Sequence, residues 1–168
     1  TQSRSSAASD VYKRQAADLL PRLTGVAVHH YENALITPGF IDTHIHYPQT
    51  GMIGAYGEQL LDWLNTYTFP TEMRFADKAH ASEVADVFIK EMLRNGTTTA
   101  LVFGSVHKQS VDALFEAAAA LNLRMIAGKV LMDRNAPEAL TDTVESGYAD
   151  SREPVSYTHL TLPTIYSV

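Results

Sequence analysis

Residues 38–46 read Pro38-Gly39-Phe40-Ile41-Asp42-Thr43-His44-Ile45-His46. The Pro-Gly pair predicts a turn that leads into a β-strand over residues 40–46. Because side chains alternate between the two faces of a strand, we expect Asp42, His44 and His46 to share one face. Two neighbouring imidazoles on one face can bind one metal ion, which makes His44 and His46 candidate metal ligands. A pair of polar residues on an edge strand is the alternative that this pattern leaves open.

The residues after this strand alternate between helical and strand-like patterns. Helices are predicted over residues 82–94, 111–121 and 137–148, and strands over residues 97–103 and 124–132. In the first helix, the apolar spacing predicts a buried stripe of Val84, Val87, Phe88 and Met92. Alternating strands and helices imply parallel strands joined by right-handed crossovers, which is an α/β fold.

Two further segments lie on either side of the first strand. Residues 26–29 and 34–37, joined through Glu32 and Asn33, predict a β-hairpin before it. After it, apolar residues recur at helical spacing, and we expect them to form local core; a cap over a site is the alternative. These residues are Leu60, Leu61, Trp63, Leu64 and Tyr67.

Composition limits the classes of protein and of metal site that fit. Of the 168 residues, 45% are hydrophobic and 19% are charged, as in a soluble globular domain. The net charge of −6 argues against an electrostatic nucleic-acid binder. The sequence contains no run of about 18 apolar residues, so we expect no membrane span. With no cysteine in the chain, a metal site must use histidine and carboxylate ligands, and we expect a cytoplasmic location.

Several motifs together resemble one enzyme family. The stretch 38–46 is similar to the first-strand signature of the amidohydrolase superfamily. Residues 46–50 and 56–72, including Trp63-Leu64-Asn65-Thr66-Tyr67-Thr68-Phe69-Pro70, resemble its guanine deaminase branch, as do residues 94–100 and 127–133. The resemblance covers residues from about 20 to about 153.

The resemblance implies a fold and a division of the chain. Residues 38–153 would form the first three βα units of a (β/α)₈ TIM barrel, and residues 16–37 the end of a small β-domain before it. In such barrels, active sites lie at the carboxyl ends of the strands, where His44 and His46 stand.

The resemblance also implies a chemistry and a set of site residues. The expected reaction is zinc-dependent hydrolytic deamination of guanine to xanthine and ammonia, with one zinc per site and iron as the other possible metal. His44 and His46 would be metal ligands and Gln49 a substrate contact. Further ligands and the acid/base residues would come from later strands, so no catalytic acid or base is expected in this chain. The complete protein is expected to be a homodimer that binds a small purine.

Some residues with suggestive chemistry are assigned other roles. Lys129 could suggest the carbamylated lysine of binuclear relatives, but it lies on the third strand instead of the fourth. We therefore expect a structural role or a supporting role behind the metal ligands. Asp42 is expected to orient the metal-binding histidines instead of binding the metal itself. His107 and Asp133 receive no assignment.

The two ends of the chain share an unusual relation. Residues 5–14 and 155–164 can be encoded by opposite strands of one DNA element, which resembles a transposase adaptor used in sequencing libraries. We therefore expect residues 1–15 and 154–168 to be artefactual and exclude them from the fold. A natural Ser/Thr-rich tail is the alternative.

Other functions are also compatible with these motifs. One is another deaminase or a chlorohydrolase of the same superfamily, and a second is a non-catalytic metal-binding module. Because two histidines cannot complete a catalytic zinc site, we expect this chain alone to be inactive. An open edge on its third strand leads us to expect poor folding as well.

Overall fold

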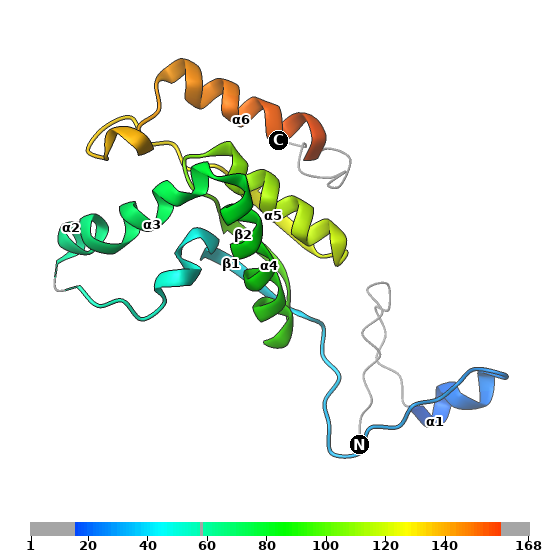
Figure 1. The fold of residues 1–168 in the computed structure, drawn as a ribbon. Helices are drawn as coiled ribbons and strands as arrows, with labels where there is room; N and C mark the ends of the chain where they lie inside the picture. Colours follow the sequence, from blue (N-terminus) through cyan, green and yellow to red (C-terminus); the bar gives the residue numbers. More distant parts are fainter. Residues whose placement is uncertain (1–15, 58, 159–168) are drawn as a thin grey trace. The chain divides into compact units, whose positions relative to one another are not determined.

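A computed structural model describes residues 16–57 and 59–158 (Figure 1). The adaptor-like residues 1–15 and 159–168 lie outside the described residues. The chain divides into two compact units, and the boundary in the sequence lies between Gly39 and Phe40. Each unit is described by itself.

The first unit contains little regular structure. It has a short helix α1 (Ala16–Leu19) and a 3₁₀ turn η1 (Leu20–Arg22), followed by extended chain. The expectation of a β-hairpin over residues 26–37 is wrong, because neither residues 26–29 nor residues 34–37 form a strand. Its turn does form, with Asn33 at a φ of 57°. An isolated two-stranded hairpin is marginally stable in water, and no described strand pairs with this segment.

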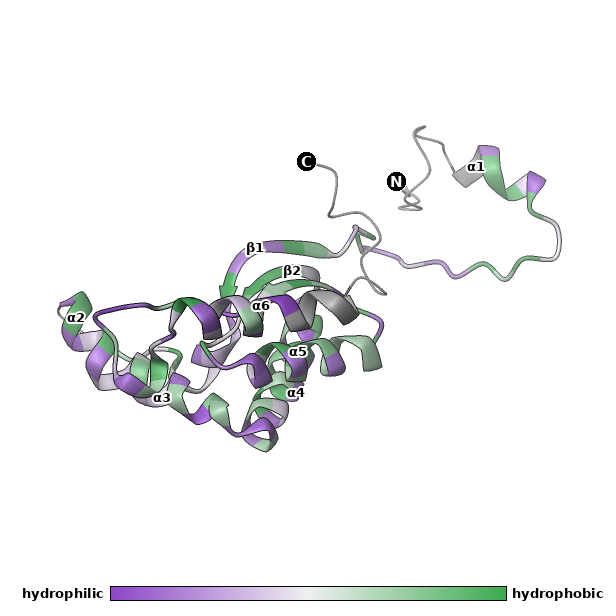
Figure 2. Cartoon of the chain, turned by 90° about the horizontal axis from the view of Figure 1, so that it is seen from above, coloured by the Kyte–Doolittle hydropathy of each residue, from purple (hydrophilic) through white to green (hydrophobic). Residues whose placement is uncertain are grey.

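The second unit is built on a parallel three-stranded sheet. Strands β1 (Phe40–His46), β2 (Thr97–Phe103) and β3 (Arg124–Gly128) lie in the order β1-β2-β3. Helices α4 (Lys78–Arg94) and α5 (Lys108–Ala120) connect them and lie on one side of the sheet (Figure 2). The parallel βα order predicted from the sequence is therefore confirmed, although β3 ends four residues earlier than expected.

The sequence predicted the end of helix α4 more accurately than its beginning. The Asp77 carboxylate accepts a hydrogen bond from the Ala79 backbone N–H at 2.9 Å, which caps the helix four residues before the expected start. The helix ends as predicted at Asn95 and Gly96, where Gly96 has a φ of 80°. Phe88 and Met92 are buried, but Val87 is 48% exposed and was wrongly placed in the stripe.

The core lies between the sheet and these two helices. Ala81, Ala85 and Ile89 of α4 share the buried face with Phe88 and Met92, at a spacing of about one helical turn. From the sheet, Ala100, Val102 and Met125 pack against them. Leu101 and Ile126 alternate with these core residues and are exposed, so the other face of the sheet is open among the described residues.

Short irregular helices join β1 to α4. They are η2 (Tyr47–Met52), α2 (Leu60–Trp63), the π-helical turn η3 (Leu64–Thr68), α3 (Phe69–Met73) and η4 (Arg74–Ala76). Leu60 and Leu61 are 69% and 70% exposed, so the expectation that they form local core is wrong. Trp63 and Leu64 are half-buried.

The last helix, in contrast to α4, begins later than predicted. Pro137 precedes only a 3₁₀ turn, η5 (Glu138–Leu140), and α6 runs over Val144–Thr158. Thr143 and Ser146 exchange hydrogen bonds between each side chain and the other's backbone N–H, at 3.0 and 3.1 Å. This reciprocal cap explains the start at Val144. The helix continues across residue 154, where we expected the adaptor-like segment to begin. No described helix is both long and apolar enough to span a membrane.

A substitution at the centre of this core tests the packing. Replacing buried Ile89 by alanine removes apolar contacts with the sheet, and we expect Ile89→Ala to lower the unfolding free energy by about 2–5 kcal/mol. The measurement is urea unfolding followed by circular dichroism. Val87→Ala on the exposed face is the matched control and should change little. The same titration tests the expectation of poor folding, because a poorly folded chain would show no cooperative transition.

Candidate metal and substrate site

Strand β1 carries an irregularity just before the two histidines. Asp42 pairs with Ala100 and Ile45 pairs with Val102, so three steps along β1 match two steps along β2. This mismatch is a β-bulge, and it interrupts the strict alternation of side chains. Asp42 therefore pairs, like Ile45, with a residue buried under the helices. The expectation that Asp42 shares a face with His44 and His46 is wrong for this reason.

His44 and His46 do converge. Their Nε2 atoms lie 3.3 Å apart, and both rings pack against Phe103 of β2, with centroid distances of 4.8 and 4.6 Å. The His46 ring is stacked on Phe103 at an interplanar angle of 10°. Two nitrogens bound to zinc at about 2.0–2.1 Å in a tetrahedral site also stand about 3.3 Å apart. The spacing of the two imidazoles therefore fits one shared metal ion.

The electrostatics of His46 favour the form that binds metal. Partial burial lowers the pKa of His46 below 6.5, and the neighbouring His44 lowers it further. Only the neutral imidazole has a free nitrogen lone pair for a metal. His46 is therefore more readily available as a ligand near neutral pH than an ordinary histidine.

The described residues do not complete a metal site. They contain no group of three or more histidine, aspartate or glutamate side chains placed to hold one ion. Asp42 uses Oδ1 to accept a hydrogen bond from the His44 backbone N–H at 3.0 Å. This contact is compatible with Asp42 shaping the strand around the ligands, although it reaches the backbone of His44 and not its ring.

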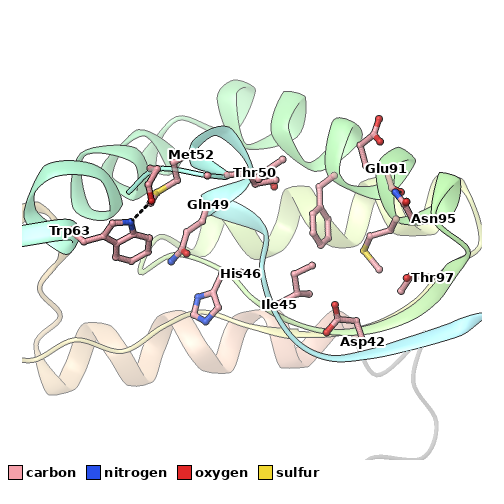
Figure 3. A pocket seen from close by; sticks show the side chains of 15 residues that line it. Asp42, Ile45, His46, Gln49, Thr50, Met52, Trp63, Glu91, Asn95 and Thr97 are labelled. Atoms are coloured by element: carbon pink, nitrogen blue, oxygen red, sulfur yellow. Dashed lines mark hydrogen bonds between the residues drawn. The ribbon is translucent and has the colours of Figure 1, made fainter. Parts of the chain in front are cut away.

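Gln49 is held next to the histidines by the packing of η2. Tyr47, two residues earlier, is fully buried; its ring packs edge-on against Phe75 at 5.3 Å, and its hydroxyl donates to the Ser110 carbonyl. The Thr50 hydroxyl donates to the Tyr47 carbonyl at 2.6 Å. Figure 3 shows the Gln49 and His46 side chains side by side. The structure thus places Gln49 beside His46, one of the two candidate metal ligands.

A buried carboxylate that the sequence analysis did not single out contacts Gln49. The Gln49 amide Nε2 donates to Glu72 Oε1 at 3.1 Å, and Glu72 is only 5% exposed. Burial raises the pKa of the Glu72 carboxyl above its usual value, while the hydrogen bond from Gln49 opposes that rise. The two residues are 23 positions apart, across irregular helices, so no regular spacing could have paired them.

A cavity of about 470 Å³ adjoins these residues (Figure 3). His46, Gln49 and Trp63 line one part of it, and Phe88 and Met92 of α4 line another. The Trp63 indole N–H donates to the Ala55 carbonyl at 3.1 Å, which closes the loop around this part. The volume is within the range of small-molecule sites.

A second polar cluster follows the ends of β2 and β3. Lys129 Nζ and Asp142 Oδ2 form an ion pair at 2.7 Å, with side chains only 1% and 8% exposed. This pair agrees with the structural role expected for Lys129. Nearby, His107 Nε2 is buried with no hydrogen-bond partner among the described residues. Burial chiefly lowers the pKa of His107, and Lys129 lowers it further, against the opposing effect of Asp142 and Asp150.

Comparisons with known proteins establish the class of this chain. The sequence signature of the amidohydrolase family matches residues 35–161. The chain therefore belongs to the amidohydrolase family. Two solved structures of triazine hydrolases, among them a zinc complex of atrazine chlorohydrolase from Arthrobacter aurescens, are 20–21% identical with TM-scores of 0.59 and show the shared fold alone.

Guanine deaminases are the most informative relatives. The chain is 61% identical to guanine deaminase of Escherichia coli over 143 residues, covering 85% of this chain and 33% of that protein. It is 42% identical to a probable guanine deaminase of Deinococcus radiodurans, over 84% of this chain and 32% of the relative. The chain thus spans about a third of the length of these relatives.

Solved structures agree with the sequence comparison. The E. coli guanine deaminase structure matches with a TM-score of 0.81 and 58% identity, over 86% of this chain and 34% of that chain. A guanine deaminase from C. acetobutylicum with guanine bound in its active site matches with a TM-score of 0.68 and 33% identity, over 74% and 32%. The partial TIM-barrel fold expected from the resemblance is thereby confirmed.

The buried ion pair allows a direct test of its structural role. We expect Lys129→Met to lower the unfolding free energy by about 3–5 kcal/mol, because it leaves the Asp142 carboxylate buried without its partner. Urea unfolding measures the change. Lys90→Met breaks the exposed pair with Asp86 and should cost at most about 1 kcal/mol. Equal losses in both variants would contradict a special role for the buried pair.

The raised pKa of Glu72 predicts a pH dependence of stability. Between the ordinary carboxyl pKa and the raised one, the folded state binds more protons than the unfolded state, so stability falls as pH rises. Glu72→Gln removes this titration. The unfolding free energy of the natural chain, relative to this variant, should therefore fall as pH rises through that window and level off above it. Exposed Glu83→Gln is the control, and an identical pH profile for both variants would refute the prediction.

Proposed function

We propose that the complete protein of which this chain is a part is a zinc-dependent guanine deaminase, which hydrolyses guanine to xanthine and ammonia. The observation that carries the proposal is the placement of two converging imidazoles beside Gln49 in a chain 61% identical to a guanine deaminase. The bound guanine in a related structure supports a purine substrate.

Each site residue has a distinct part in the proposed reaction. His44 and His46 would hold the metal through their converging Nε2 atoms, and Phe103 packs against both rings. Zinc, when bound, supplies Lewis-acid activation of the attacking water. The Gln49 amide both donates and accepts hydrogen bonds, which suits the mixed donor and acceptor edge of a purine. The remaining metal ligands and the proton carrier are supplied by segments that this chain does not include, and the chain alone is inactive.

The roles of these residues can be tested in a chimeric enzyme whose activity is measurable. Residues 16–153 of this chain replace the aligned segment of the E. coli enzyme, and the 61% identity makes the exchange practicable. We expect the chimera to release ammonia from guanine and not from cytosine or atrazine. Turnover of a triazine instead of guanine would favour a chlorohydrolase. Loss of all activity in a folded, zinc-loaded chimera would contradict the proposal.

Substituting a proposed metal ligand should impair zinc binding and turnover, whereas substituting an exposed histidine should not. In the same chimera, we expect His44→Ala or His46→Ala to lower the zinc content and to reduce guanine turnover by at least about 100-fold, because even the loss of an outer partner of a metal ligand costs about 10–100-fold. Atomic absorption and ammonia release are the measurements. His29→Ala, at an exposed position, is the control. Full zinc content in either ligand variant would exclude that histidine from the site.

Further properties belong to the same proposal. Zinc is the metal that the family resemblance implies, and neutral imidazole nitrogens such as those of His44 and His46 are ordinary zinc ligands; iron is the alternative. A cytoplasmic location is supported by a sequence without cysteine. A homodimeric complete protein is carried over from the family resemblance.

The origin of the two ends is also proposed. Residues 1–15 and 154–168 are assigned to adaptor DNA, because residues 5–14 and 155–164 fit opposite strands of one element. A long read of the source DNA across the segment encoding residues 16–153 tests this. We expect the reading frame to continue after residue 153 into further strands; recovery of both end segments in genomic DNA would refute the assignment.

A further inference from the structure

Glu72 is a buried carboxylate, and its burial calls for a specific partner. It is 5% exposed and lies in α3, whereas charged side chains are seldom buried without partners. The partner that the structure provides is the amide of Gln49, with Nε2 and Oε1 3.1 Å apart. The side chain proposed to contact the purine is thus tied to a buried carboxylate.

Packing on both sides keeps this contact in place. On the Gln49 side, Tyr47 is fully buried against Phe75 and Phe88, with ring centroids at 5.3 and 5.7 Å. On the Glu72 side, Phe75 follows three residues later in η4 and is itself fully buried. One aromatic contact therefore connects η2 to the segment that carries Glu72, so the two side chains do not depend on each other alone for their positions.

The chemistry of the pair allows only one orientation of the amide. An ionised carboxylate has acceptors only, whereas a glutamine amide has a donor end and an acceptor end. With the NH₂ group toward Glu72, the pair forms a charge-assisted hydrogen bond. The flipped amide would place two acceptor oxygens against each other. The orientation with NH₂ toward Glu72 leaves Oε1 and the second N–H of Gln49 for another partner.

We propose that Glu72 is a positioning residue that holds the Gln49 amide in this single orientation beside the metal ligands, and so determines how Gln49 receives the purine. The inference rests on the proposed function, since Gln49 is a substrate contact only there. Glu72 acts through Gln49 and does not itself touch the substrate.

Steady-state kinetics of the chimera test the role. Glu72→Gln keeps the size of the side chain but allows either amide orientation. We expect it to raise KM for guanine by roughly fivefold to tenfold, as for one weakened hydrogen bond, with kcat little changed. Thr68→Val is the matched control: Thr68 is as buried as Glu72, and its hydroxyl has no hydrogen-bond partner among the described residues. It should leave KM unchanged.

A double-mutant cycle distinguishes positioning from general packing. If Glu72 acts through Gln49, Glu72→Gln should add nothing to the KM of a Gln49→Ala chimera. A rise in KM of the same size in both backgrounds would show that Glu72 acts elsewhere and would overturn the inference. An unchanged KM in Glu72→Gln alone would overturn it as well.

A spectroscopic measurement tests the contact without any activity. In the 168-residue chain, the side-chain NH₂ signals of Gln49, assigned by their loss in Gln49→Ala, should shift in Glu72→Gln and not in Thr68→Val. Unmoved signals would refute the contact. If these signals shift but the chimera with the natural segment does not deaminate guanine, the proposed function fails while the contact between Glu72 and Gln49 stands.

Discussion

The burial of Tyr47 is the contact on which the arrangement of the site depends. Its ring lies against Phe75 and Phe88, and its hydroxyl donates to the Ser110 carbonyl near the start of α5. Burial strongly raises the pKa of this hydroxyl, so it stays protonated and keeps donating. One side chain directly after β1 thus joins the strand end to α4, α5 and the irregular segment before α4. His46 precedes it and Gln49 follows two residues later, so both take their positions from this anchor.

The site combines a hydrogen-bonded polar pair with two converging histidines. His44 and His46 converge on the open face of the sheet, against Phe103. Next to them, the Gln49 amide donates a hydrogen bond to Glu72. This division suits an enzyme in which one group of residues activates water and another orients the substrate. Under the proposed function, the chain would supply part of each group, in keeping with its span of about a third of its relatives.

The predictions from sequence were best where a single local rule decided the outcome. The limits of β1 and β2, the end of α4 at Asn95-Gly96 and the parallel βα order all agreed with the structure. Helix starts were placed less well, because a cap such as Asp77 or Thr143 can begin a helix outside the apolar pattern. The upstream hairpin was wrong because a strand forms only where another strand pairs with it.

Within the candidate site, the sequence by itself located His44, His46 and Gln49. Two histidines one residue apart on a strand necessarily come close, and Gln49 followed them within the same short segment. Only the tertiary structure decided the rest. It removed Asp42 from the histidine face, because a bulge depends on how β1 pairs with β2. It also brought Glu72 to Gln49, because their contact is set by aromatic packing across irregular helices and not by a periodic spacing along the chain.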